Sequence, residues 1–125
     1  MNRERYLQIK LKYKHSEKGI YSTLKSGAKR RNISMGMTRD EFVEWYKKQK
    51  QVCIYCKRSV DEIREKLDFL AKRMKRMTID RLDNSVGYFF NNMGLCCYRC
   101  NAIKGDFFTK DEMLKIGKII YDKNS

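Results

Sequence analysis

The stretch that decides the fold is residues 77–105, MTIDRLDNSVGYFFNNMGLCCYRCNAIKG. Its first six residues, MTIDRL, are the β-branched and apolar residues typical of a strand, and NSVG at 84–87 is a polar turn that ends in glycine. A second strand is expected from Met93 to Cys97, and the residues after it suit a helix that starts at the cysteine pair. The stretch therefore predicts a β-hairpin followed by a helix.

Two pairs of cysteines with the same spacing are the strongest chemical signal in the chain. Cys53 and Cys56 belong to CIYC, and Cys97 and Cys100 belong to CYRC. Four thiolates at about 2.3 Å from one Zn²⁺ require two such short loops to meet in space. Nothing in the sequence suggests secretion, so the paired spacing favours one structural zinc ion over disulfide bonds. The fifth cysteine, Cys96, points to the other side of the strand and is expected to be a small core residue.

The charge of the chain indicates a polyanionic partner. The 125 residues include 29 Lys and Arg against 15 Asp and Glu, which gives a formal net charge of +14. Such an excess supplies the sequence-independent part of nucleic-acid binding, although charge alone also fits a merely soluble basic surface. No apolar run approaches the roughly 20 residues that cross a bilayer, and the N-terminus lacks the apolar centre of a signal peptide. We therefore expect a soluble, intracellular protein without a membrane partner.

Residues 1–52 are expected to form a basic helical lead-in. Residues 1–16 mix basic and apolar side chains, and their pattern fits a strand and a helix equally well. From Ser16 to Arg31 the apolar residues recur at helical spacing and the opposite face is basic, which predicts an amphipathic helix. The basic face is either a solvated surface or a phosphate-contacting one. The residues expected to contact DNA at the end of this helix are Lys29, Arg30 and Arg31.

Three capping boxes mark the starts of further helices, because each has a Ser or Thr followed three residues later by Glu. They are Thr38 with Glu41, which opens a helix through Lys50, Ser59 with Glu62, which opens a helix over 59–73, and Thr109 with Glu112, which opens a closing helix. Arg76 ends a basic run before the first strand and is also expected to contact DNA. We expect residues 53–125 to form a zinc-stapled core with its closing helix, packed with 1–52 as one compact domain.

These motifs resemble the HNH endonucleases of the ββα-metal fold, in their zinc-bound form with two Cys-x-x-Cys loops. The resemblance is carried by CIYC at 53–56, TIDRLD at 78–83, GY at 87–88, NNMGLCC at 91–97 and CNAIKG at 100–105. It implies an α+β fold in which a hairpin and a helix form the ββα-metal core, with a structural zinc and flanking helices. It also implies a metal-dependent endonuclease that hydrolyses phosphodiester bonds in double-stranded DNA.

The resemblance also implies roles for single residues. Asp80 and Asn101 would hold one catalytic divalent ion, Mg²⁺ or Mn²⁺, and Asn92 would be the structural asparagine that ties down the loop. The residue after the acid is usually a histidine that acts as general base, but here it is Arg81, as in an Asp-Arg branch that includes some phage and restriction-type enzymes. Because an arginine side chain is always protonated at neutral pH, Arg81 can only donate hydrogen bonds, and it is expected to bind the scissile phosphate. Lys104 is expected either to project toward the same phosphate or to be an ordinary surface lysine.

The identity of the general base is therefore an open question, since the single histidine, His15, lies far upstream. Our prediction is Tyr55, which lies inside the first cysteine loop. In the family fold this loop is close to the strand that carries the acid, and neighbouring cations would lower a phenol pKa that starts near 10. A packing role for the ring is the alternative, and Asp83 and Tyr88 are the other candidate bases.

Two other functions are compatible with the sequence. The chain could be a non-catalytic, zinc-stabilised nucleic-acid-binding module on a degenerate HNH scaffold, which Arg81 favours and the retention of Asp80 and Asn101 disfavours. It could also be an assembly protein that docks onto a larger enzyme. As an enzyme, a monomer would nick one strand, and a homodimer would be needed to cut both strands.

Overall fold

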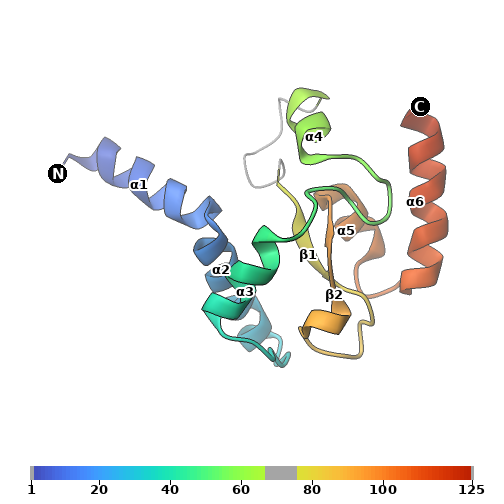
Figure 1. Ribbon diagram of the computed structural model, residues 1–125, viewed down its shortest axis with the longest axis horizontal. Coiled ribbons are helices and arrows are strands. Elements are labelled where there is room, and N and C mark those ends of the chain that lie inside the picture. The colour runs from blue at the N-terminus through green and yellow to red at the C-terminus, as the bar shows by residue number, and fades with distance from the viewer. Residues whose placement is uncertain (1, 67–75, 125) are drawn as a thin grey trace. The chain divides into compact units, whose positions relative to one another are not determined.

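The computed structural model describes residues 2–66 and 76–124 (Figure 1). Its elements are α1 (Arg3–His15), α2 (Glu17–Arg30), α3 (Arg39–Lys47), α4 (Val60–Lys66), β1 (Thr78–Arg81), the 3₁₀ helix η2 (Phe90–Asn92), β2 (Met93–Cys96), α5 (Tyr98–Lys104) and α6 (Lys110–Asn124). The chain divides into two compact units, one of Met1–Gln49 with Tyr88–Phe90 and the other of Lys50–Gly87 with Asn91–Ser125. The division lies close to the end of the expected lead-in, but the segment 88–90 belongs to the first unit.

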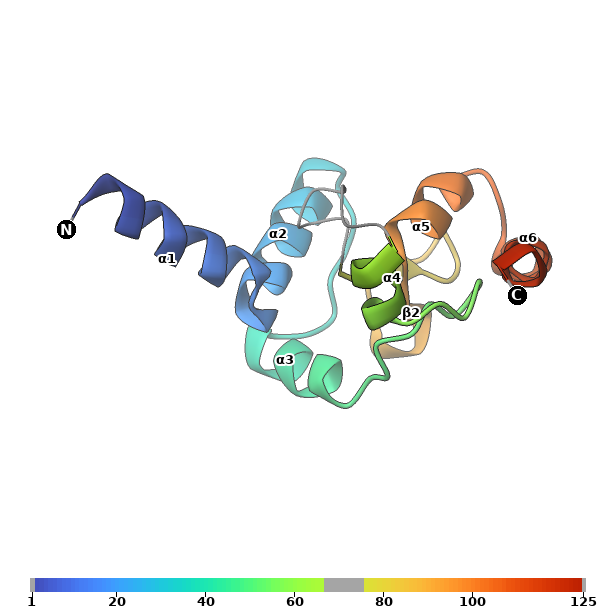
Figure 2. The same cartoon turned by 90° about the horizontal axis from the view of Figure 1, so that it is seen from above.

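The first unit is built from α1, α2 and α3. The N-terminal residues form a helix, which resolves the choice that their sequence left open, and α1 leads directly into α2 (Figure 2). Ser16 separates the two helices, because its backbone is extended and its side chain accepts a hydrogen bond from the backbone N–H of Gly19 at 3.2 Å. The predicted amphipathic helix is therefore present as α2.

Phe42 lies at the centre of the core of the first unit and is 0% exposed. Its ring lies 5.5 Å from that of Tyr21 on α2, and 5.9 Å and 5.8 Å from those of Trp45 and Tyr46 on α3, so Phe42 joins the two helices. The capping box at Thr38 and Glu41 is formed as predicted, and α3 ends at Lys47 instead of Lys50. These aromatic rings form part of the hydrophobic core of the first unit.

The second unit contains the hairpin. β1 and β2 are antiparallel, with Asp80 opposite Gly94 and Arg81 opposite Met93, so the predicted order of strand, strand and helix is confirmed (Figure 1). The strands are joined by residues 82–92, which include the predicted turn at 84–87. The side-chain amide of Asn92 exchanges hydrogen bonds with the backbone of residues 83–87 and holds them as a loop.

The region between the two cysteine pairs begins with α4. The backbone N–H of Glu62 donates to the Ser59 hydroxyl at 3.1 Å, as expected at the start of the predicted helix. The helix is described as far as Lys66, and residues 67–73 of the expected helix lie outside the described part of the chain.

Two helices follow the hairpin. Cys97 is the N-cap of α5, and Gly105 is its C-cap, whose φ of 48° lies in the left-handed region that favours glycine. The predicted capping box at Thr109 and Glu112 opens α6. A Cβ at Gly117 would clash with the carbonyl oxygen of Tyr55, so the backbone of α6 packs directly on the first cysteine loop. Within residues 2–66 and 76–124, no helix is both long and apolar enough to span a membrane.

Candidate active site and metal centre

The four paired cysteines form one cluster in the second unit. Their sulfur atoms all lie within 4.8 Å of one another, and the four side chains are buried. The Sγ atoms of Cys56 and Cys97 are 3.7 Å apart, and a tetrahedral site with Zn–S bonds of about 2.3 Å requires about 3.8 Å between sulfur atoms. The residues therefore fit a zinc ion, and the predicted Cys₄ grouping is confirmed as a cluster that could hold one.

The surroundings of the cluster favour thiolates. Backbone N–H groups of Cys56 and Cys100 point at the sulfur atoms of Cys53 and Cys97, each at 3.5 Å. The Arg58 guanidinium, only 7% exposed, lies 3.9 Å from the Cys97 sulfur and places a positive charge beside it. Arg58 was not predicted, because a basic residue just after a cysteine pair is unremarkable in a chain with this charge.

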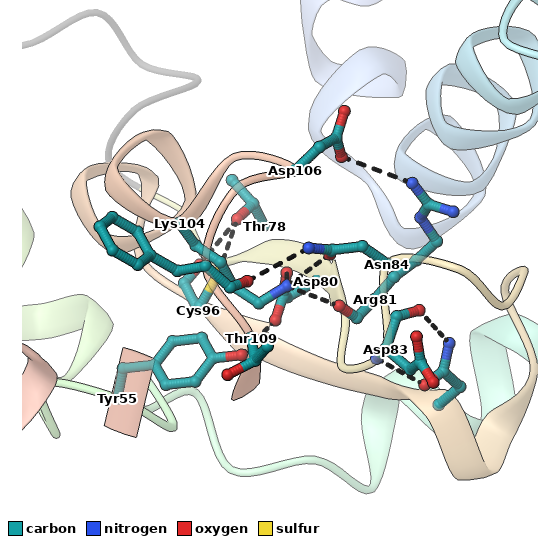
Figure 3. Close-up of polar contacts among 12 residues, drawn as sticks. Tyr55, Thr78, Asp80, Arg81, Asp83, Asn84, Cys96, Lys104, Asp106 and Thr109 are labelled. Atoms are coloured by element: carbon teal, nitrogen blue, oxygen red, sulfur yellow. Dashed lines mark hydrogen bonds and ion pairs between the residues drawn. The ribbon is translucent and has the colours of Figure 1, made fainter. Parts of the chain in front are cut away.

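Cys96 lies outside the cluster, as predicted. It is 0% exposed, and the Thr78 hydroxyl lies 3.4 Å from its sulfur (Figure 3). Burial raises the pKa of the Cys96 thiol to about 12, so it stays protonated at neutral pH. It packs as a small core residue.

Asp80 is the centre of the second group of functional residues. It lies on β1, is 4% exposed, and both of its carboxylate oxygens have partners (Figure 3). The Tyr55 hydroxyl donates to Oδ2, and the Lys104 ammonium lies 3.3 Å from Oδ1. Burial raises the pKa of Asp80, while the hydrogen bond from Tyr55 and the charge of Lys104 oppose that rise.

The structure contradicts the surface-lysine alternative for Lys104. Its side chain is 0% exposed and points inward. The ammonium donates to the backbone carbonyl of Arg81 at 2.9 Å and to Oδ1 of Asn84 at 2.6 Å (Figure 3). Four-carbon lysine side chains usually reach water, and this one is held inside by the Asp80 carboxylate and two neutral oxygens.

Tyr55 lies beside the acid, as the sequence analysis expected, but the direction of its pKa shift is the opposite of the expected one. The side chain is 2% exposed, and burial followed by the hydrogen bond to Asp80 raises the pKa of the phenol. Neighbouring cations are visible in the sequence, whereas the burial of Tyr55 and its contact with Asp80 depend on the fold. The phenol is therefore a hydrogen-bond donor in this arrangement.

Arg81 extends from the end of β1. Its side chain is 12% exposed, one guanidinium nitrogen donates to the carbonyl of Val86 at 3.2 Å, and another lies 3.6 Å from the Asp106 carboxylate (Figure 3). The Asp106 side chain is 80% exposed, so this ion pair contributes little to stability. Asp106 was not predicted, since its pairing depends on the fold.

Asn101 lies in the first turns of α5, which packs against β1, and is half-buried. A carboxylate from Asp80 and an amide oxygen from Asn101 are the hard oxygen donors that Mg²⁺ and Mn²⁺ prefer, so the residues fit such an ion chemically. Asn92 ties down the adjoining loop through its bonds to Asp83, Val86 and Gly87. These contacts give Asn92 a structural place beside the site.

The two other candidate bases are already engaged. Hydrogen bonds from the Ser85 hydroxyl and backbone lower the pKa of Asp83, which makes it a weaker base. Tyr88 is buried in the first unit, and its hydroxyl accepts a hydrogen bond from Arg31 at 3.2 Å. Neither is poised for proton transfer by these contacts.

The expected DNA-contacting residues of the first unit lie together at the end of α2. Lys29 and Arg30 occupy its last turn and are exposed, and Arg31 is the C-cap. Cations at a helix C-terminus also stabilise the helix itself, so their position has a structural reason as well. Arg76, in the second unit, is half-buried just before β1.

A comparison with solved structures finds the rare-cutting HNH restriction endonuclease PacI, described by its "extraordinary mechanism of DNA perturbation". The two chains are 26% identical, the TM-score is 0.76, and the match covers 86% of this chain and 78% of the other. No protein-family model and no curated protein matches the chain. The resemblance to HNH endonucleases and the α+β fold with a two-stranded antiparallel sheet are thereby confirmed.

Proposed function

Because the chain has the fold of an HNH endonuclease, we propose that it is a metal-dependent endonuclease that hydrolyses phosphodiester bonds in double-stranded DNA. The fold similarity supports a nuclease at the level of the family. The observation that carries the proposal for this chain is the buried Asp80 carboxylate on β1, beside the helix that bears Asn101. Burying a carboxylate costs free energy, and an ion-binding role gives a reason for its place.

The proposed chemistry assigns separate tasks to the residues. Asp80 and Asn101 would hold a divalent ion, which supplies stabilisation of the charge that develops on the phosphate and the leaving 3′-oxygen. Arg81 would exchange the exposed Asp106 carboxylate for the scissile phosphate and orient it. Tyr55 fixes the Asp80 carboxylate through its hydroxyl. We assign Mg²⁺ or Mn²⁺ to this site and zinc to the cysteine cluster.

Tyr55→Phe is expected to lower the cleavage rate by about 100-fold, because it removes one hydroxyl and keeps the ring. If Tyr55 is the general base, the rate of the unmodified protein should rise from pH 6 to pH 9, and the variant should lose that rise. If Tyr55 only donates a hydrogen bond to Asp80, the variant should be slower but keep the same pH profile. Single-turnover rates at several pH values distinguish the two, and a variant with full activity contradicts both roles.

DNA binding is expected to weaken steeply with salt, in line with the formal net charge of +14. Each phosphate contact contributes about −0.9 to the slope of log K against log salt concentration. Replacing Arg30, exposed at the end of α2, by Gln should reduce the magnitude of that slope by about one contact. Fluorescence anisotropy with a labelled duplex measures the slope, and a nearly flat salt response would contradict a DNA-binding basic surface.

The test of function is incubation of the purified, zinc-loaded protein with supercoiled plasmid and Mg²⁺, Mn²⁺ or EDTA. We expect nicked plasmid with the divalent ions and intact plasmid with EDTA. The competing function is a non-catalytic nucleic-acid-binding module, which Arg81 at the usual histidine position and the pairing of Asp80 with Lys104 favour. That function predicts retarded but uncut plasmid. We expect the protein to act inside the cell, as a monomer that nicks or a homodimer that cuts both strands.

A further inference from the structure

Lys104 is a buried cation that the proposed chemistry does not use. Its ammonium meets three oxygens, the Arg81 carbonyl at 2.9 Å, Asn84 Oδ1 at 2.6 Å and Asp80 Oδ1 at 3.3 Å (Figure 3). A charged group that is 0% exposed is costly unless it is paired and hydrogen-bonded. An apolar side chain of the same length would fill this space at a lower desolvation cost, so the charge itself has a role.

The position of Lys104 links the elements that carry the two proposed ion ligands. Lys104 follows Asn101 by three residues on α5, and residues at this spacing lie on the same side of a helix. Its ammonium contacts Asp80 and the Arg81 carbonyl, both on β1. The contact therefore fixes α5 against β1 and sets the separation between Asn101 and Asp80.

The charge of Lys104 opposes a second cation at the same carboxylate. Carboxylate oxygens bind Mg²⁺ at about 2.1 Å, so an ion on either oxygen of Asp80 would lie within about 8 Å of the Lys104 ammonium, which is 3.3 Å from Oδ1. At an effective dielectric constant of about 20, the repulsion between a single and a double charge at that distance is several times the thermal energy. The negative charge of Asp80 is therefore partly balanced by Lys104 before an ion binds.

We propose that Lys104 is a positioning residue, a resident internal cation that shares Asp80 with the divalent ion. It aligns Asp80 with Asn101 and keeps ion binding weak until the negative charge of a DNA phosphate is present. This inference rests on the proposed endonuclease function. It predicts opposite effects on two measurable quantities when the charge is removed, namely tighter ion binding and slower cleavage.

The test measures Mn²⁺ binding to the zinc-loaded protein without DNA, from the electron paramagnetic resonance signal of free Mn²⁺. Lys104→Met removes the charge and keeps the length of the side chain, and we expect its Mn²⁺ affinity to rise at least about tenfold. Its cleavage rate at saturating Mn²⁺ should fall about tenfold, because Asp80 and Asn101 lose their alignment. Lys118→Met, on the exposed side of α6, carries the same change in net charge and should alter neither quantity.

A second variant keeps the test decisive if Lys104→Met fails to fold. Lys104→Gln retains an N–H donor for the Arg81 carbonyl and removes the charge, so it should show the same gain in Mn²⁺ affinity. With an uncleavable duplex present, the difference in affinity between the unmodified protein and either variant should shrink.

Equal or weaker Mn²⁺ binding by both variants would overturn the role of Lys104. In that case the proposed function stands as long as the unmodified protein still nicks plasmid with Mg²⁺ or Mn²⁺. The proposed function, and this inference with it, would instead be overturned if the unmodified protein leaves plasmid intact and binds no Mn²⁺ in the presence of DNA. The two failures are therefore separate observations.

Discussion

Replacing Cys97 by serine is expected to abolish the cooperative unfolding transition of the second unit. Cys97 is both a member of the sulfur cluster and the N-cap of α5, where its side chain accepts from the Cys100 backbone N–H. Serine is itself a favourable N-cap, so the variant keeps the cap and loses only the thiolate. A structural zinc contributes about 10–16 kcal/mol in small zinc-binding domains, which matches or exceeds the roughly 5–15 kcal/mol by which whole domains are stable.

Zinc content and thermal unfolding followed by circular dichroism are the measurements for this variant. The matched control is Cys96→Ser, since Cys96 is the neighbouring residue, equally buried and outside the cluster. The control should bind one zinc ion per chain and unfold cooperatively, with a loss of about 1–3 kcal/mol. A Cys97→Ser protein with one zinc ion and an unchanged melting temperature would show that the cluster is not a structural metal site.

Local patterns in the sequence predicted the parts of the fold that local chemistry determines. The boxes at Thr38 and Thr109 form because each depends on groups within one turn of helix. The β-branched strand at 78–81 and the cysteine spacing predicted the hairpin, the helix after it and the four-sulfur cluster. Asn92 holds the connection between the two strands, because it binds the backbone of residues up to nine positions away.

The parts of the site that the sequence did not predict depend on burial and on distant partners. The sequence left Lys104 as either a phosphate-directed or a surface lysine, and its inward direction results from Asp80, Arg81 and Asn84, which lie 20 or more positions away. The pKa shift of Tyr55 was expected with the wrong sign for the same reason. Charge counting along the chain includes neighbouring cations but not the loss of water around a buried phenol.

The same contacts change what a substitution at Asp80 should do. Asp80→Asn is expected to lower the cleavage rate by about 1,000-fold or more. Of the two residues assigned to the proposed ion site, Asp80 is the one that supplies a carboxylate. The sequence alone predicts that fold, zinc content and DNA binding survive. The structure adds a cost in stability of about 3–5 kcal/mol, since the Lys104 ammonium, 0% exposed, would lose its counter-charge. A loss of activity in this variant alone would therefore be ambiguous.

Asp80→Asn combined with Lys104→Met removes both charges of the buried pair and resolves that ambiguity. We expect the double variant to recover most of the lost stability, because neither partner is left charged and unpaired, and to remain inactive, because the carboxylate is still absent. Melting temperature, zinc content and salt-dependent DNA binding should approach those of the unmodified protein, while plasmid stays supercoiled with Mg²⁺ or Mn²⁺. A double variant that nicks plasmid at the normal rate would remove Asp80 from the chemistry. Recovery of stability with a loss of cleavage far beyond the roughly tenfold loss expected for Lys104→Met alone would instead assign the Asp80 charge to catalysis.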